Sequence, residues 1–177
     1  MDFTYRPVDT NTWEDLERFF EAKGGPHFCW CMVWRPMAPE LSRSKKADKK
    51  AALKSSVNCG EPVGILAYSD SEPVAWCSIA PRSSYRDLSG DPSLDGVWSL
   101  VCFFIKRAYR GRGLTAKLIA AAVNYARENG ARYVEAYPVT PDSPSYRFMG
   151  YTRTFQRLGF ELRGKAGLRR NVMTLKL

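Results

Sequence analysis

The spacing of apolar residues along the chain predicts four helices. Helical periodicity places the first between about residues 12 and 22, with a polar residue as its N-terminal cap. A second helical region is expected at residues 45–57, a third at residues 114–129, and a fourth that ends at Leu158. The positions expected to face the core in the first and third helices are Trp13, Leu16, Phe19, Phe20, Leu114, Leu118, Ile119, Ala122, Val123 and Ala126.

Runs of β-branched and aromatic residues predict the strands. Residues 63–68 and 73–80 flank the turn Ser69-Asp70-Ser71-Glu72, which indicates a hairpin. Residues 97–105 are apolar throughout, as a buried strand should be. Further strands are expected near residues 4–8 and 132–137, and two more after Leu158. The predicted order is therefore β-α-α-β-β-β-α-β-α-β-β.

The segment between the apolar strand and the third helix, Tyr109-Arg110-Gly111-Arg112-Gly113-Leu114-Thr115, indicates an anion-binding loop. Two glycines let the backbone bend so that several N–H groups point into one concavity. The start of the helix adds the partial positive charge of its dipole, and Arg110 and Arg112 supply full charges suited to phosphate. The question is which anion this loop holds.

Two familiar phosphate loops fit the segment poorly. A Walker loop needs Lys-Ser or Lys-Thr after its glycines, and the sequence lacks that pair here. A dinucleotide fingerprint matches Gly111-x-Gly113-x-x-Ala116, with Glu135 where a ribose-binding carboxylate would stand. However, the segment 106–110 separates the strand from the first glycine, and too little chain follows for further βαβ units. The dinucleotide interpretation is therefore disfavoured.

A third interpretation rests on a resemblance. Arg110-Gly111-Arg112-Gly113-Leu114 resembles the acyl-CoA pyrophosphate loop of the GNAT superfamily of N-acetyltransferases, usually Arg/Gln-x-x-Gly-x-Gly/Ala, with Thr115 where Gly or Ala is usual. The segment 155–161, Phe-Gln-Arg-Leu-Gly-Phe-Glu, is similar to the family's Tyr-x-x-x-Gly-Phe segment. The resemblance covers residues 62–177 well and residues 1–61 more loosely. The strings around Cys29-Trp30-Cys31, 97–104 and 135–139 resemble one bacterial subgroup.

The resemblance implies a single GNAT domain over residues 1–177, an α/β fold with a central mixed sheet flanked by helices on both faces. It implies an N-acyltransferase that moves an acyl group from acetyl-CoA to an amine of a small molecule or protein, without a metal. In the family, the strand before the loop holds the pantetheine and thioester through its backbone. The residues that the resemblance assigns to acetyl-CoA are Phe103, Phe104, Ile105, Arg110, Gly111, Arg112, Gly113, Leu114 and Thr115.

The general acid is where the chain departs from the family pattern. Thioester aminolysis releases a thiolate that a nearby acid can protonate. The family often places a tyrosine at the position of Phe155, and phenylalanine cannot donate a proton. Tyr151, expected one helical turn earlier on the same face, is the first candidate, and Tyr137 or a water molecule is the alternative.

Glu135 is the leading candidate for the general base. It interrupts the apolar strand 132–137, which lies beside the thioester-binding strand in this fold. A carboxylate there is costly unless it faces the cleft or is paired, and pairing with an arginine is the competing interpretation. His27 is the one histidine of the chain and is a second candidate base.

The segment 27–34 carries aromatic residues together with Cys29 and Cys31. With His27 these thiols make three potential metal ligands, but the Cys-x-x-Cys spacing of a zinc knuckle and a second ligand pair are missing, so no metal is expected. Phe28, Trp30 and Trp34 are instead expected either to line the acceptor pocket or to pack in the core.

Length, composition and charge set outer limits. The 177 residues, 45% of them hydrophobic, suit one domain with one core. Five cysteines, two of them in apolar strands, favour reduced thiols. The sequence has neither an apolar run long enough to span a membrane nor a leader, so a cytoplasmic protein with no membrane association is expected.

The net charge of +9 is concentrated in residues 43–54 and 153–170. It is interpreted as attraction for CoA or an acidic acceptor, and not for nucleic acid, because neither region interleaves aromatic with basic residues.

Two function classes remain at this stage. One is the acetyl-CoA-dependent N-acyltransferase, and the alternative is a non-catalytic acyl-CoA-binding module, which Phe155 keeps open. The acceptor, the length of the acyl chain and the existence of a homodimer are left open.

Overall fold

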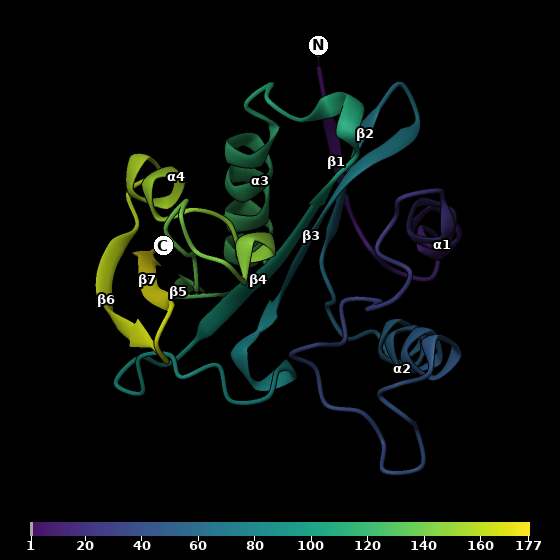
Figure 1. The fold of residues 1–177 in the computed structure, drawn as a ribbon, viewed down its shortest axis with the longest axis horizontal. Coiled ribbons are helices and arrows are strands. Elements are labelled where there is room, and N and C mark those ends of the chain that lie inside the picture. Colours follow the sequence, from purple (N-terminus) through teal and green to yellow (C-terminus); the bar gives the residue numbers. More distant parts are fainter. Residues whose placement is uncertain (1) are drawn as a thin grey trace.

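Residues 2–177, which the computed structural model describes, fold in the order predicted from the sequence. The strands and helices are β1 (Thr4–Pro7), α1 (Trp13–Glu21), α2 (Lys46–Asn58), β2 (Ile65–Ser69), β3 (Glu72–Pro81), β4 (Val97–Ile105), α3 (Leu114–Glu128), β5 (Tyr133–Ala136), α4 (Thr152–Arg157), β6 (Glu161–Ala166) and β7 (Arg170–Lys176). The strands form one sheet in the order β1-β2-β3-β4-β5-β7-β6 (Figure 1). The β4–β5 pair is parallel and the other neighbours are antiparallel, so the predicted mixed sheet is confirmed.

Helices cover both faces of the sheet because the strand side chains alternate between two apolar clusters. Along β2, Ile65 and Ala67 join the cluster under α3 and α4, whereas Leu66 and Tyr68 join the cluster under α1 and α2. All ten residues predicted to face inward from the first and third helices are buried. The expected hairpin is present too, with Asp70 and Ser71 in its turn at φ 52° and 76°.

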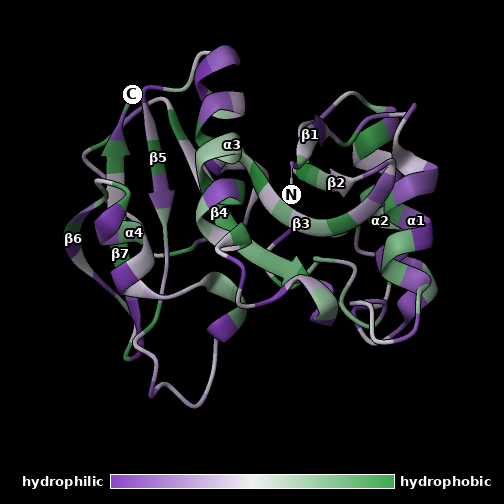
Figure 2. Cartoon of the chain, turned by 90° about the horizontal axis from the view of Figure 1, so that it is seen from above, coloured by the Kyte–Doolittle hydropathy of each residue, from purple (hydrophilic) through white to green (hydrophobic). Residues whose placement is uncertain are grey.

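Strand β4 changes its neighbours along its length. Its first part, Val97 to Leu100, pairs with β5 from Tyr133 to Ala136, and this ladder ends there. At the same place the register with β3 shifts, from Ile79 opposite Leu100 to Ser78 opposite Cys102, which leaves Val101 as a bulge. Beyond the bulge, the chain after β5 turns away, and Val139 pairs with Gly150 and Thr152 instead. Within residues 2–177, no strand therefore pairs with β4 on its β5 side from Val101 to Ile105, so the backbone edge there is open to a ligand; this segment is hydrophobic in Figure 2.

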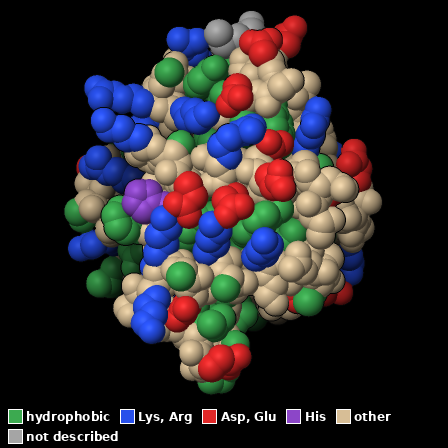
Figure 3. All heavy atoms as spheres, turned by 90° about the vertical axis from the view of Figure 1, so that its right-hand side faces the viewer, with side chains coloured by type: hydrophobic (Ala, Val, Ile, Leu, Met, Phe, Trp, Pro, Cys, Tyr) green, Lys and Arg blue, Asp and Glu red, His purple; other side chains and the backbone are tan. Residues whose placement is uncertain are grey.

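The first basic region of the sequence lies on α2 and is partly neutralised by α1. Lys46 forms an ion pair with Glu21, and Lys50 with Glu17 and Glu21. Figure 3, which shows the face that carries these helices, has acidic and basic side chains next to each other over its middle. This part of the positive charge is thus a solvated helix face.

Strand β6 closes one end of the sheet and is exposed over most of its length. It carries Glu161, Arg163 and Lys165, and Arg163 pairs with Glu161 over 3.3 Å. None of the helices in residues 2–177 is both long and apolar enough to cross a membrane.

Candidate functional site

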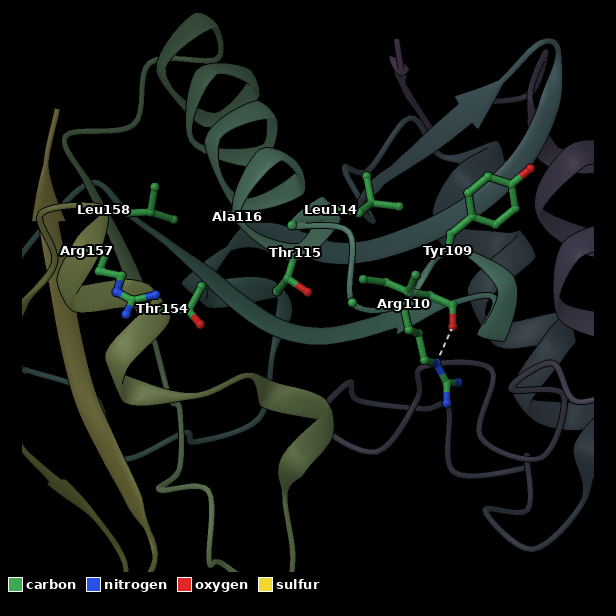
Figure 4. A pocket seen from close by; sticks show the side chains of 11 residues that line it. Tyr109, Arg110, Leu114, Thr115, Ala116, Thr154, Arg157 and Leu158 are labelled. Carbon is green, nitrogen blue, oxygen red and sulfur yellow. Dashed lines mark hydrogen bonds between the residues drawn. The ribbon is translucent and has the colours of Figure 1, made fainter. Parts of the chain in front are cut away.

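A pocket of about 360 Å³ lies where the start of α3 faces α4 (Figure 4). We call it the loop pocket. Its lining residues are Ile105, Tyr109, Arg110, Gly111, Gly113, Leu114, Thr115, Ala116, Thr154, Arg157 and Leu158.

The two glycines of the loop give this pocket its floor. Gly111 and Gly113 both have φ 73°, the left-handed region that glycine adopts without strain. Apart from the adjacent residues of the chain, no atom of residues 2–177 lies within 4 Å of the position where a Cβ would stand on either glycine, so a ligand can approach the backbone closely. Gly113 caps α3, whose first amides have no acceptor inside the helix and point out of its N-terminus. The geometry of the loop therefore suits an anion.

Two arginines flank the start of α3. Arg110 is oriented by its own Nε, which donates to the carbonyl oxygen of Ile105 over 2.9 Å, and Arg157 comes from α4 on the opposite side (Figure 4). The hydroxyl-bearing side chain of Thr115 lies between them in this view. Helix dipole, free amides and two guanidinium groups together suit a doubly charged group such as a pyrophosphate.

Most residues predicted to bind acetyl-CoA lie in this pocket. Ile105, Arg110, Gly111, Gly113, Leu114 and Thr115 line it. Arg112 is outside its lining, and its guanidinium instead lies 5.8 Å from the ring centre of Tyr109. Phe103 and Phe104 line a second pocket, described below.

The sequence analysis did not identify the residues that α4 contributes to the loop pocket. Thr154, Arg157 and Leu158 line the loop pocket, and their spacing of three and four residues places them on one face of a helix. That spacing was visible in the second basic region and is the signal that would have identified Arg157.

We expect Arg157→Ala to raise the dissociation constant for acetyl-CoA by about threefold to tenfold, the effect of one charge-assisted contact made partly in water. The loss should shrink at high salt, because the contact is screened. Isothermal titration checks this. Arg153→Ala is the matched control, since Arg153 is exposed on the same helix but outside the pocket lining. Equal losses in the two variants would contradict a specific contact.

A second pocket, of about 190 Å³, opens on the α1–α2 side of β4. We call it the apolar pocket. It is lined by Pro26, Cys29, Cys31, Val33, Trp34, Val101, Cys102, Phe103, Phe104 and Phe148. The open part of β4 thus runs through both sites, from Val101 in the apolar pocket to Ile105 in the loop pocket.

The predicted aromatic wall is only partly present in this pocket. Trp34 lines it, but Trp30 is fully buried and stacks on Trp13 at 5.8 Å, and Phe28 is exposed to solvent. His27 is half-buried beside Phe28, with ring centres 4.1 Å apart, and is not in the pocket lining. Within residues 2–177, no three His, Cys, Asp or Glu side chains are arranged to hold a metal ion.

Glu135 is fully buried in a polar cluster away from both pockets. Its Oε1 accepts a hydrogen bond from Tyr137 Oη over 2.6 Å and lies 3.4 Å from Arg82 Nη1, and its Oε2 accepts the backbone N–H of Asp91 over 2.8 Å. Arg82 also donates to two carbonyl groups of the loop 82–96. A Cβ on Gly90 would lie 2.0 Å from Glu135 Oε1, so a larger residue there would have to displace the carboxylate or the loop. The Glu135 carboxylate therefore links the loop 82–96 to β5. This is the pairing with an arginine that the sequence analysis gave as the competing interpretation of Glu135.

The two candidate acids differ in exposure. Tyr137 is fully buried, and burial followed by the charge of Glu135 raises its pKa well above the usual value, so its proton is held. Tyr151 is 37% exposed and precedes α4 in an extended conformation. Phe155 is fully buried against Phe103 and Phe160. The expectation that Tyr151 and Phe155 share a helix face was wrong, because Tyr151 stands outside the helix.

Comparisons with known proteins agree with this geometry. The acetyltransferase (GNAT) family model matches residues 12–160. No curated protein matches the chain by sequence.

Solved structures share the fold at low identity. The PaiA N-acetyltransferase of Thermoplasma acidophilum in complex with coenzyme A is 14% identical with a TM-score of 0.59, and the match covers 100% of both chains. AAC(6')-Ib in complex with ribostamycin and coenzyme A is 20% identical with a TM-score of 0.65, covering 99% of this chain and 94% of that one. An acetyltransferase of the GNAT family from Streptococcus pneumoniae is 13% identical with a TM-score of 0.59, covering 99% and 100%. With the family match over most of the chain, these likenesses lead to one conclusion: the chain belongs to the GNAT family of acetyltransferases.

Proposed function

We propose that the protein transfers the acetyl group of acetyl-CoA to a primary amine that enters the apolar pocket. The observation that carries the proposal is the open edge of β4, which connects the loop pocket to the apolar pocket. An extended thioester arm that pairs with the backbone of Phe103 to Ile105 would span the two sites. Its pyrophosphate would then lie at the start of α3, against Arg110, Gly113 and Thr115.

The lining of the apolar pocket suggests the class of acceptor. Its residues are aliphatic, aromatic or sulfur-containing, and within the described chain none of them carries a carboxylate. A polycationic amine would find no counter-charge there, whereas an amine on an aromatic or branched alkyl body would bury its apolar part. The proposed acceptors are therefore small primary arylalkyl or alkyl amines.

The same apolar lining explains how the amine becomes a nucleophile. Only the neutral amine can attack, and burial in an apolar site disfavours the ammonium form. We therefore assign no base role to Glu135, whose carboxylate is engaged with Arg82 and Tyr137.

A turnover assay with a set of amines tests the proposal. Release of free CoA thiol from acetyl-CoA is expected with arylalkyl amines and not with ribostamycin, and the acetylated amine should appear in equal amount. Binding of acetyl-CoA without turnover on any amine would support the alternative of an acyl-CoA-binding module. A protein that does not bind acetyl-CoA would contradict both functions, the acetyltransferase and the binding module.

Tyr151 is the proposed donor of a proton to the departing CoA thiolate. On that role, Tyr151→Phe lowers kcat by about 10²–10⁴-fold, the range for a lost general acid, with acetyl-CoA affinity unchanged. Phe155→Tyr in this background should restore part of the rate, because it returns the family residue. Steady-state kinetics and titration of the variants decide the matter. A decrease in kcat below about threefold would contradict the role and assign protonation to water.

A further inference from the structure

Two cations hold the segment 26–34, which supplies one wall of the apolar pocket. Lys49 of α2 donates a hydrogen bond to the carbonyl oxygen of Phe28. Arg86 donates one to the carbonyl oxygen of Val33 over 2.7 Å. A carbonyl oxygen binds a cation without neutralising it, and neither side chain forms an ion pair within residues 2–177. Both therefore keep their charge beside the pocket.

Two further arginines meet at the end of this segment. Arg43 donates to the carbonyl oxygen of Met32 over 3.0 Å and to that of Arg35 over 2.7 Å. Arg35 itself is buried, and its Nη2 donates to Val63 O over 2.9 Å and to Tyr85 Oη over 3.1 Å. Burial raises the pKa of Tyr85 to about 12, so that phenol is neutral, and the Nε of Arg35 has no hydrogen-bond partner in the described chain. Arg35 is thus a buried cation bound only to uncharged groups, which is costly.

Arg170 of β7 adds a fifth cation at the Trp34 end of the apolar pocket. It is 7% exposed, and its guanidinium lies 4.4 Å from the ring centre of Trp34, which lines the pocket, and 5.5 Å from that of Tyr146. Its Nη1 donates to Leu88 O over 3.3 Å. Burial lowers the pKa of Arg170, and the carboxylate whose charge opposes this, Asp87, is exposed to solvent. Aromatic faces and one carbonyl group stabilise this cation but leave it without a bound anion.

The apolar pocket is therefore bordered by cations, and none of its lining residues in the described chain carries a carboxylate. None of the cations forms an ion pair within the part of the chain that the structure describes; they are Lys49, Arg86, Arg43, Arg35 and Arg170. Charges of one sign beside low-dielectric walls focus a potential into a cleft, here a positive one. Acetyl-CoA would not offset it, because its phosphates are proposed to lie at the start of α3 and its pantetheine arm and acetyl group are uncharged. The anion that suits this pocket has to come with the acceptor.

We propose that the acceptor is an amine whose apolar body carries a carboxylate, and that Arg170 binds this carboxylate. The inference rests on the proposed function, because it concerns the amine that receives the acetyl group. Within residues 2–177 the one hydrogen-bond acceptor of Arg170 is Leu88 O, whereas a guanidinium has five N–H donors. An amine without a carboxylate arrives mostly as a cation, which these arginines repel, and a carboxylate on the same molecule offsets that charge.

Pairs of acceptors that differ only by carboxylate or amide test the inference in the wild-type protein. L-phenylalanine is compared with L-phenylalaninamide, and 4-(aminomethyl)benzoate with 4-(aminomethyl)benzamide, so that the carboxylate lies next to the amine or at the far end. In at least one pair, kcat/KM is expected to be more than about tenfold higher for the carboxylate, the effect of one hydrogen-bonded charge. The preference should shrink at high salt, because charges near the surface are screened. Turnover without a preference in either pair would overturn the inference and leave the proposed function intact.

Substitutions at Arg170 test where the carboxylate binds. Arg170→Met keeps an apolar side chain against Trp34 but removes the charge, so the ratio of kcat/KM between carboxylate and amide should fall to within about threefold of one. Arg170→Lys keeps the charge and should keep part of the preference. Arg169→Met is the matched control, because Arg169 is exposed and donates to Ser145 Oγ, and its ratio should equal that of the wild type. An undiminished ratio in Arg170→Met, or an equal loss in Arg169→Met, would overturn the role of Arg170.

A binding measurement separates this inference from the proposed function. 3-Phenylpropanoate has a carboxylate and no amine, so its binding to the full chain does not depend on acetyl transfer. Isothermal titration should show tighter binding of 3-phenylpropanoate than of 3-phenylpropanamide to the wild type, and the difference should disappear in Arg170→Met. If this holds although no amine is acetylated, the anion site is supported and the failure lies in the proposed transfer. Equal affinity of the two compounds, or binding of neither, would overturn the inference.

Discussion

Gly113→Val is expected to raise the dissociation constant for acetyl-CoA by more than about tenfold, the cost of one or two lost hydrogen bonds to a charged group. Valine avoids the φ of 73° found at this residue, so the start of α3 must shift and its amides turn from the ligand. The added side chain would also occupy the open space above the loop. Isothermal titration with acetyl-CoA measures the effect.

Gly130→Val is the matched control for this prediction. Gly130 follows the other end of α3 and has φ 79°, and among the described residues nothing beyond its chain neighbours lies within 4 Å of its Cβ position. The two substitutions should lower stability to a similar extent, but only Gly113→Val should weaken binding. Unchanged affinity in a folded Gly113→Val protein would remove the loop pocket from the acetyl-CoA site.

Glu135→Ala is expected to lower the free energy of unfolding by about 2–4 kcal/mol, because Tyr137 Oη and the Asp91 amide lose their acceptor and Arg82 loses its counter-charge. For a chain of this length the melting temperature should fall by roughly 10 °C. Urea and thermal unfolding measure both quantities. Turnover of the folded variant at low temperature should stay within about threefold of the wild type, since we assign Glu135 no role in proton transfer.

Glu135→Gln separates packing from charge at the same position. Glutamine keeps an oxygen that can accept from Tyr137 or Asp91, so its loss of stability should be smaller than that of alanine. A Glu135→Gln protein that is as stable as the wild type but slower by about a hundredfold or more would contradict our assignment and make Glu135 the base.

The parts of the fold that could be predicted depend on local patterns. The buried face of α1 follows from Trp13, Leu16, Phe19 and Phe20, because helical period and burial coincide there. The anion loop could be recognised because glycines, arginines and a helix start are neighbours in the sequence. These signals need no knowledge of distant residues.

The parts that could not be predicted depend on contacts between distant segments. The partners of Glu135 come from the loop 82–96, and its burial among them cannot be read from its own strand. The hydrogen bond from Trp76 Nε1 to Cys31 Sγ likewise joins segments that lie 45 residues apart in the sequence. The prediction for Tyr151 was wrong because helical spacing was applied to a residue that precedes α4. The backbone of Tyr151 has an extended conformation and not a helical one.

The exposed charges of β6 have a consequence for self-association. An edge strand offers unpaired backbone groups to which a strand of another chain can add. Here such an addition would have to crowd or desolvate Glu161, Arg163 and Lys165, which resists it. At the opposite edge β1 is only four residues long and ends in Pro7, which has no N–H to donate. The sheet is thus protected at both ends from growing by strand addition, and a stable pair of these chains would have to form through its helices or loops.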